Sequence, residues 1–114
     1  MVIERGEVWW ADLGEPDASE PGYRRPIVIV QSDGFNRSRL RTVIAVVLMT
    51  NVRLVEAPGN VLVPAKASGL PRDSVANVSQ VITVDRDYLL DRAGRIRGQL
   101  MKDIDSGLRL VLGL

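Results

Sequence analysis

The chain has 114 residues, of which 46% are hydrophobic, and a formal net charge of +1, values that fit one globular domain over residues 1–114. It contains no cysteine and no histidine, which excludes disulfides, thiol nucleophiles, histidine general bases and the usual zinc ligands. No apolar stretch approaches the roughly 18 residues of a membrane span, and no signal-peptide pattern is visible at the N-terminus. We therefore expect a cytoplasmic protein that does not enter the membrane.

Charge is segregated along the chain. Residues 1–23 hold six acidic side chains and one arginine, a net charge of −5, whereas residues 24–53 hold six arginines and one aspartate, a net charge of +5. Thirteen of the fifteen basic residues are arginine, which suits forked contacts with phosphate and stacking on bases. The alternative is that the acidic and basic segments simply pair with each other in the fold.

The first half of the chain predicts three strands. Residues 7–13 form a strand with one buried face, and residues 14–24, rich in glycine, proline and acids, form a long exposed loop. Residues 26–31 form a second strand that is apolar almost throughout. A polar connector over 35–41, with room for one helical turn, leads to a third apolar strand over 42–49.

The second half predicts short strands and then a helix. Residues 61–63 form a fourth strand, and residues 74–77 and 79–84 form two more, followed by a helical turn with Asp85 as its N-cap. The last segment is an amphipathic helix, although Gly107 lies inside it. Its apolar residues recur at helix spacing: Leu100, Met101, Ile104, Leu108, Val111 and Leu112. Together these elements predict an α+β, mainly β fold, a small antiparallel barrel or bent sheet with a C-terminal helix.

Two adjacent arginines mark the start of the second strand. Arg25 precedes Pro26, which biases it toward an extended conformation and sets where the strand begins. A guanidinium at this point could bind an anion, or it could be a surface charge whose stem covers apolar neighbours. Arg24 and Arg25 are thus either a solvated edge or part of a site.

Other polar residues near strand ends are ambiguous in the same way. Glu20 lies five residues before Arg25 and is either a proton acceptor or a solvated loop acid. Thr50 and Asn51 end the third strand and either reach a shared cleft or simply terminate the strand. Gln80 fits a solvated face at least as well as a site. No acidic loop with calcium spacing and no glycine-rich phosphate loop is present, so the sequence predicts no metal site and no cofactor.

Four stretches, taken in order, carry a resemblance to a known family: RGEVWWADL, then ASEPGYRRPIVIVQSD with FNRS downstream, then VVLMTN, then GLPRDSVANVSQVITVDRDYL. At this order and spacing the chain resembles the MazF/PemK family of toxin endoribonucleases of type II toxin–antitoxin systems. The similarity covers nearly the whole chain, including the C-terminal helix. It implies an SH3-like barrel, a homodimer, metal-independent cleavage of single-stranded RNA, and neutralisation by a cognate antitoxin.

The resemblance also implies roles for individual residues. By position, Arg25 and Thr50 match the catalytic arginine and threonine, and Glu20 is the candidate general base. The residues expected to bind RNA are Ser19, Arg24, Asn36, Arg37, Asn51 and Gln80. Because RNA supplies its own 2′-hydroxyl nucleophile, the expected products are a 2′,3′-cyclic phosphate and a 5′-hydroxyl.

Two departures from the family pattern prevent copying an RNA sequence preference from any relative. Pro21 stands where many members have glutamine, and Asn51 where many have serine or alanine. The sequence also leaves open whether messenger, transfer or ribosomal RNA is the main target.

Two other classes of function remain open at this point. One is a non-enzymatic toxin similar to the CcdB proteins that act on DNA gyrase, although the chain ends Leu112-Gly113-Leu114 and lacks the tryptophan those proteins have near the C-terminus. The other is an RNA-binding barrel without catalysis. Incubation with labelled RNA would separate the three.

Overall fold

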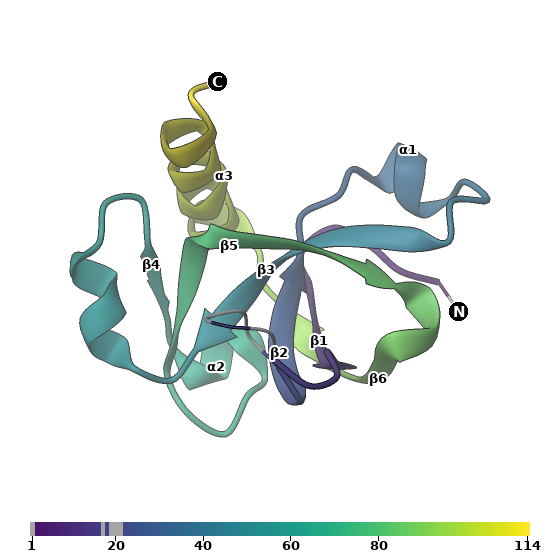
Figure 1. The fold of residues 1–114 in the computed structure, drawn as a ribbon. Helices are drawn as coiled ribbons and strands as arrows, with labels where there is room; N and C mark the ends of the chain where they lie inside the picture. Colours follow the sequence, from purple (N-terminus) through teal and green to yellow (C-terminus); the bar gives the residue numbers. More distant parts are fainter. Residues whose placement is uncertain (1, 17, 19–21) are drawn as a thin grey trace.

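The fold is built on one curled antiparallel sheet with a long helix on one of its faces (Figure 1). The structure, a computed structural model, describes residues 2–16, 18 and 22–114. The strands are β1 (Glu7–Asp12), β2 (Arg24–Ile29), β3 (Thr42–Met49), β4 (Val61–Val63), β5 (Ser74–Asp85) and β6 (Leu89–Arg95). The helices are α1 (Asp33–Asn36), α2 (Ala65–Ser68) and α3 (Gly98–Leu112), with the 3-10 turns η1 (Val52–Glu56) and η2 (Arg86–Tyr88).

The strand order is β4-β5-β3-β2-β1-β6, and each neighbouring pair is antiparallel. Strands β4 and β6 therefore lie at the two ends of the sheet, which curls into a half-barrel. The first strand pairs with both β2 and β6, so that two strands far apart in the sequence are neighbours in the sheet. The predicted mainly β, barrel-like fold with a C-terminal helix is confirmed.

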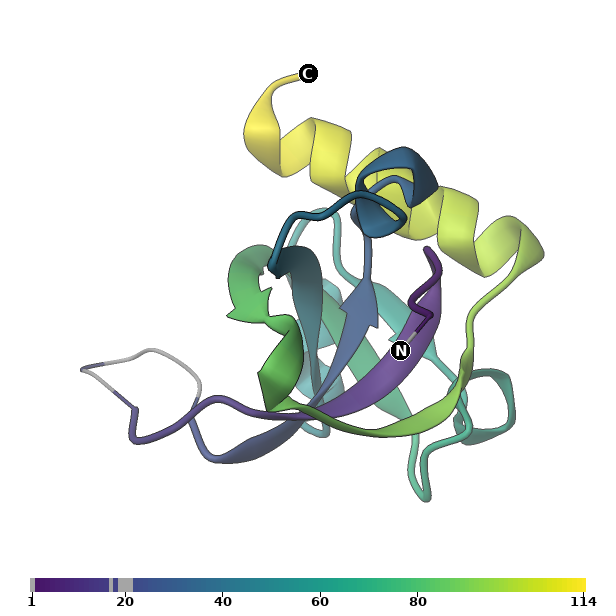
Figure 2. The ribbon, with the colours of Figure 1, turned by 90° about the vertical axis from the view of Figure 1, so that its right-hand side faces the viewer.

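Alternation along the strands divides the core into two clusters. The register partners Val8, Val28 and Val46 belong to the cluster that Met101 and Ile104 of α3 cover, and we call this side of the sheet the helix face. Their chain neighbours Trp9, Ile27 and Val47 belong to the cluster on the opposite face. Figure 2 shows α3 lying along one side of the sheet. Full burial of a valine or isoleucine side chain contributes about 1.5–3 kcal/mol, so both faces stabilise the sheet.

Most of the predicted elements are confirmed, some with shifted ends. The strand over 42–49 and the short strand over 61–63 match β3 and β4. Asp85 is the N-cap of η2, because its side chain accepts a hydrogen bond from the backbone N–H of Asp87 at 2.9 Å. Strand β2 begins at Arg24 rather than at Pro26, so both arginines are strand residues paired with β1.

Two strand predictions are wrong in an informative way. The segments 74–77 and 79–84 were predicted as separate strands, but they form the single strand β5. A register shift in the β3–β5 ladder, between Val46 and Val47, marks a bulge at the point where the pattern is interrupted. Strand β6 was not predicted, since its sequence LLDRAGR lacks an apolar alternation and its side chains are mostly exposed or half-buried.

A close contact between α3 and a neighbouring loop explains why the helix contains a glycine at position 107. Its Cα faces Gly59 in the loop before β4, and a Cβ added to Gly107 would overlap the carbonyl oxygen of Gly59 and lie 3.1 Å from a methyl group of Val78. The absence of a side chain thus allows α3 to approach the loop backbone closely.

The C-terminal end of α3 has a different environment from its middle. Met101 and Ile104 are buried, whereas Leu110, Val111 and Leu112 are exposed, although the helix spacing placed Val111 and Leu112 on the apolar side. This end of the helix projects beyond the sheet (Figure 1).

None of the helices in the described part of the chain combines the length and apolar character needed to cross a bilayer.

Candidate active site

Arg24, Arg25 and Thr50 line one pocket of about 140 Å³ at the end of the sheet where β2 begins and β3 ends. Antiparallel pairing produces this arrangement, because Ile27 pairs with Val47 and the start of β2 therefore lies beside the end of β3. The other residues around the pocket are Trp10, Pro26, Leu48, Leu70, Pro71, Arg72 and Ser74. The structure thus brings together Arg25 and Thr50, two of the three residues that are predicted to be catalytic.

The two arginines leave β2 on opposite sides, since neighbouring strand residues alternate between faces. Arg24 lies on the helix face, where its guanidinium carbon is 4.2 Å from the centroid of the Trp10 ring. An exposed ion pair joins its Nη2 to Asp91 at 3.6 Å. Arg24 therefore covers an aromatic side chain and is more constrained than a plain loop charge.

Arg25 is held by a contact to the loop that precedes it. Its Nε donates a hydrogen bond to the carbonyl oxygen of Gly22 at 3.2 Å, which is the one hydrogen bond of this guanidinium within the described residues. The side chain is exposed, as is that of Thr50 across the pocket. Arg25 in β2 and Thr50 just after β3 therefore both line the pocket, although they lie in different segments of the chain.

Asn51 and Gln80, predicted to bind RNA, do not line this pocket. Asn51 is the N-cap of η1, and its side-chain oxygen accepts a hydrogen bond from the backbone N–H of Arg53 at 3.2 Å. Gln80 accepts a hydrogen bond from Asn77 at 3.1 Å near the β5 bulge. Asn51 is nonetheless adjacent to Thr50 in the chain and exposed.

Asn36, which is predicted to bind RNA, is buried and hydrogen-bonded to neighbouring residues in this structure. Its side chain is only 4% exposed. Its Nδ2 donates to the backbone oxygen of Gln31 at 2.9 Å, and its Oδ1 accepts from the Gln31 side chain at 3.0 Å. These bonds tie α1 to the end of β2. Arg37, the next residue, is exposed but lies outside the residues that line the pocket.

Ser19 and the candidate base Glu20 lie outside the described residues.

Sequence reasoning also missed part of the pocket. Arg72 adds a third exposed guanidinium to its edge, and Trp10 adds an aromatic side chain. Arg72 follows Pro71 in a turn-rich segment, so its only sequence signal was a basic residue just before a strand.

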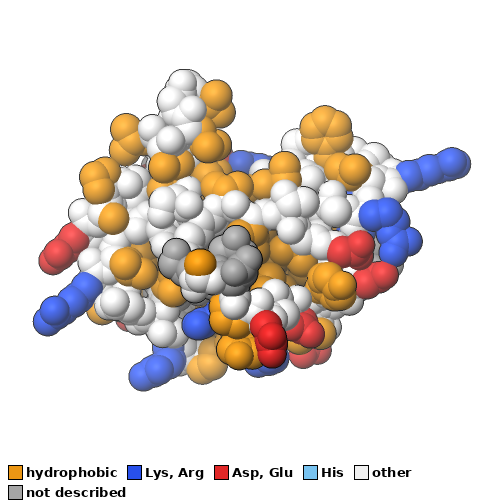
Figure 3. Space-filling model, viewed as in Figure 1, with side chains coloured by type: hydrophobic (Ala, Val, Ile, Leu, Met, Phe, Trp, Pro, Cys, Tyr) orange, Lys and Arg blue, Asp and Glu red, His pale blue; other side chains and the backbone are white. Residues whose placement is uncertain are grey.

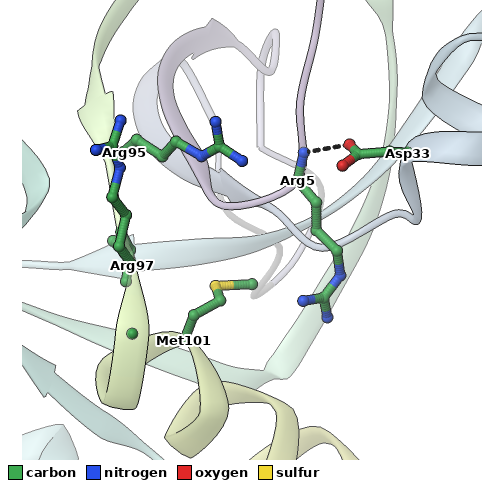
Figure 4. A pocket seen from close by; sticks show the side chains of 7 residues that line it. Arg5, Asp33, Arg95, Arg97 and Met101 are labelled. Carbon is green, nitrogen blue, oxygen red and sulfur yellow. Dashed lines mark hydrogen bonds between the residues drawn. The ribbon is translucent and has the colours of Figure 1, made fainter.

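A second hollow, of about 400 Å³, lies at the start of α3 and contains none of the predicted site residues (Figure 4). Arg5, Arg95 and Arg97 line it together with Asp33. Carboxylates already compensate two of these arginines, because Arg5 pairs with Asp105 and Arg95 pairs with Glu4 at 2.7 Å. This hollow is therefore less suited to an anionic substrate than its arginine content indicates.

Asp33 at this hollow should make stability depend on pH. The backbone N–H of Arg5, 2.7 Å from Oδ1, and then the Asn36 side chain hold the pKa of Asp33 below its ordinary value. A carboxyl group whose pKa is lower in the folded than in the unfolded protein stabilises the folded state above about pH 4. This stabilisation is lost as pH falls through the folded-state pKa. We expect Asp33→Asn to destabilise the protein at pH 7 and by a smaller amount at pH 3. Urea unfolding of both proteins at the two pH values tests this, and an equal difference at both would contradict it.

Comparison with known proteins identifies the family of this chain. The profile of the family described as the PemK-like, MazF-like toxin of type II toxin–antitoxin systems matches residues 4–112. The chain belongs to this family. The endoribonuclease MazF6 of Mycobacterium tuberculosis (strain ATCC 25618 / H37Rv) is 51% identical over 114 residues, 100% of each chain. The prediction of a MazF/PemK-type endoribonuclease is thereby confirmed.

Solved structures of MazF proteins have the same fold. A mycobacterial endoribonuclease in complex with its cognate antitoxin superposes with a TM-score of 0.77 at 28% identity, covering 99% of this chain and 95% of the other. MazF of Deinococcus radiodurans superposes with a TM-score of 0.83, covering 100% of this chain and 99% of the other, at 17% identity. At such low identity the second comparison supports the MazF fold alone.

Proposed function

We propose that this MazF/PemK-family toxin cleaves single-stranded RNA at the pocket where β2 begins and β3 ends, by attack of the RNA's own 2′-hydroxyl. The observation that carries the proposal is that Arg25 and Thr50 line the same pocket. The chain has no histidine and no cysteine, so a reaction whose nucleophile belongs to the substrate suits its side chains.

The chemistry requires one proton to leave and one to arrive. The 2′-oxygen attacks phosphorus and loses its proton to a base, the bond from phosphorus to the 5′-oxygen breaks, and that oxygen gains a proton. Charge accumulates on the non-bridging oxygens, where the Arg25 guanidinium acts as the clamp and the Thr50 hydroxyl donates a hydrogen bond. An arginine is not deprotonated in proteins, so Arg25 is not the base, and Glu20 is our candidate for that role.

Binding of the RNA chain beyond the scissile phosphate draws on the positive segment. Arg24 and Arg72 lie at the pocket edge, where guanidinium groups can contact the flanking phosphates. The other predicted RNA contacts are Ser19, Asn36, Arg37, Asn51 and Gln80. Messenger RNA is the proposed substrate, with transfer and ribosomal RNA as alternative targets.

Cleavage should not depend on a divalent metal ion. We expect the purified protein to cleave single-stranded RNA at the same rate in excess EDTA, and to leave a 2′,3′-cyclic phosphate and a 5′-hydroxyl. Mass spectrometry of the products tests the chemistry, and labelling by a polynucleotide kinase tests the 5′-hydroxyl. A 5′-phosphate product, or loss of cleavage in EDTA that added Mg²⁺ restores, would overturn this mechanism. RNA binding without cleavage would instead favour an RNA-binding barrel without catalysis. Neither binding nor cleavage would favour a toxin similar to the CcdB proteins.

Two protein partners complete the proposal. The first is a cognate antitoxin, by analogy with the mycobacterial endoribonuclease whose structure contains one. The second is another copy of this chain, because apolar side chains are exposed at the projecting end of α3. Figure 3 shows hydrophobic side chains gathered there. Leu110, Leu112 and Leu114 are 63%, 56% and 86% exposed, and a homodimer interface would remove such groups from water.

A further inference from the structure

Four arginines gather at the end of β3 opposite the candidate active site, and we call them the arginine patch. Arg37, Arg39 and Arg41 lie in the connector between α1 and β3, and Arg86 lies in η2. The connector and η2 are neighbours, because the backbone N–H of Arg86 donates to the carbonyl oxygen of Arg41 at 2.9 Å. Figure 3 shows basic side chains at the end of the molecule where Figure 1 places α1.

Acidic side chains neutralise only part of the arginine patch. Arg41 pairs with Asp87 at 2.8 Å and, more distantly, with Asp85 at 4.0 Å. Arg37 and Arg39 are exposed and form no ion pair within the described residues. The four arginines thus exceed the two aspartates beside them by two positive charges, which leaves this surface attractive to an anionic partner.

Arg86 holds the patch in a fixed arrangement. Its Nε donates to the carbonyl oxygen of Leu40 at 2.8 Å, and its Nη2 donates to that of Asn36 at 2.8 Å. These bonds fix the backbone on both sides of Arg37 and Arg39. Because backbone carbonyls carry no net charge, the Arg86 guanidinium keeps its positive charge beside them. A surface that is ordered before a ligand arrives loses less entropy when the ligand binds.

A hollow of about 260 Å³ opens within the arginine patch. A protein cavity of roughly 150 Å³ accepts a benzene molecule, so this hollow has room for a phosphate group with part of its ribose. Arginine is the side chain best suited to forked contacts with phosphate. The residues that line the hollow are Ser38, Arg39, Leu40, Arg41, Arg86 and Asp87.

Two exposed aromatic side chains flank the arginine patch. Phe35, in α1, is 61% exposed, and Tyr88, in η2, is 56% exposed. The chain has only two tryptophans, two tyrosines and one phenylalanine, so this end of the molecule carries a large share of its aromatic side chains. Nucleic-acid bases stack on such rings whatever their sequence. An acidic peptide would match the arginines, whereas a single strand of RNA matches the arginines with its phosphates and the rings with its bases.

An RNA bound at the candidate active site can also reach this surface. The connector leads into β3 at Thr42, and Thr50 follows the other end of the strand. Strand β3 has eight residues, so its ends lie at most about 25 Å apart. A stacked strand advances roughly 3.4 Å per nucleotide, so about seven nucleotides span this distance.

We propose that the arginine patch, together with Phe35 and Tyr88, is a second binding surface for single-stranded RNA, which holds a flank of the substrate remote from the cut. The arginines contact phosphates and the rings stack on bases, so binding here does not depend on the base sequence. The surface therefore favours long unpaired segments over short ones. This inference rests on the proposed RNA cleavage.

The first measurement compares two RNAs that contain the same cleaved sequence. One ends close to the cut, and the other carries unstructured extensions of about twelve nucleotides on both sides, longer than the span of β3. Two linked contacts raise affinity, so the wild type should have a KM about tenfold lower for the long RNA, at a similar kcat. Arg39→Glu should abolish this advantage and leave kcat/KM on the short RNA unchanged. Loss of one phosphate contact should also lower the salt dependence of long-RNA binding by about 0.7 in the log–log slope.

Lys102→Glu is the matched control, because it makes the same change in charge at an exposed position of α3. It should keep the advantage of the long RNA. An equal loss in both variants would mean that overall charge is responsible, and a wild type without any preference for the long RNA would mean that no second surface exists. Both results overturn the inference while leaving the cleavage mechanism intact. Failure to cleave either RNA would refute the proposed function, and this inference with it.

The second measurement tests stacking with a long RNA whose extensions consist of abasic nucleotides, which keep the phosphates and lack the bases. Phe35→Ala should weaken binding of the ordinary long RNA about tenfold and leave binding of the abasic one unchanged. Arg39→Glu should weaken binding of both. An equal effect of Phe35→Ala on the two RNAs would refute stacking. Binding of a poly-glutamate peptide that Arg39→Glu abolishes, without any advantage of the long RNA, would assign the surface to an acidic protein and overturn the proposal.

Discussion

Replacement of Arg25 by alanine is expected to lower the rate of RNA cleavage by about 10²–10³-fold, the usual effect of removing one oriented electrostatic donor from an active site. Arg25 lines the pocket with Thr50, and the one hydrogen bond of its guanidinium within the described residues is to the backbone of Gly22. Loss of the exposed side chain should therefore affect the transition state far more than the fold. Single-turnover cleavage at saturating enzyme measures the effect directly.

Two comparison variants make this result specific. Arg24→Ala removes the neighbouring arginine with its contact to Trp10, and should weaken RNA binding while cleavage of bound RNA falls by a smaller factor. Lys102→Ala removes an exposed positive charge from α3, outside the pocket, and should leave cleavage unchanged. Cleavage at the wild-type rate by Arg25→Ala would refute the mechanism. An equal loss of cleavage in all three variants would show that the overall positive charge of the protein, and not Arg25 itself, determines the rate.

The second large effect is expected at Gly107, where alanine should destabilise the protein by about 2 kcal/mol through overpacking. Helix propensity alone predicts the opposite, a gain of about 1 kcal/mol for alanine over glycine inside a helix. The difference arises because a Cβ at Gly107 would overlap the carbonyl oxygen of Gly59, which is backbone and cannot rotate away. Urea unfolding at one fixed protein concentration measures the change, since association would make stability depend on concentration.

Ser106→Ala is the control for this measurement. Ser106 precedes Gly107 in α3 and is exposed, so alanine there should stabilise the helix by a few tenths of a kcal/mol. A stabilised Gly107→Ala protein would show that α3 does not contact the loop at Gly59. RNA cleavage by the two variants under native conditions would then report whether the helix position affects the site.

Sequence patterns predicted the buried strands better than the exposed ones. Strands β2 and β3 have nearly continuous apolar runs, which a sheet covered on both faces requires. Strand β6 lies at the sheet edge with most of its side chains accessible to water, so no apolar pattern marks it. The β5 bulge likewise interrupts an apolar alternation without ending the strand. These features depend on which strands become neighbours, and local sequence does not contain that information.

The candidate site, like the fold, could be predicted only in part from the sequence. The resemblance to MazF/PemK toxins identified Arg25 and Thr50, and antiparallel pairing explains why they share a pocket. Local sequence could not show that Asn36 is buried in a hydrogen-bonded connector, because an asparagine in a polar segment is usually exposed.

The pairing of β1 with β6 also affects how the protein can be made. Strand β1 leaves the ribosome well before its partner β6, because strands β2 to β5 lie between them in the sequence. Contacts between residues so far apart in sequence form late, because the long intervening chain must be ordered first. We therefore expect a nascent chain to remain incompletely folded until β6 has left the ribosome. Translation of β6 would then be the first point at which this toxin can become active.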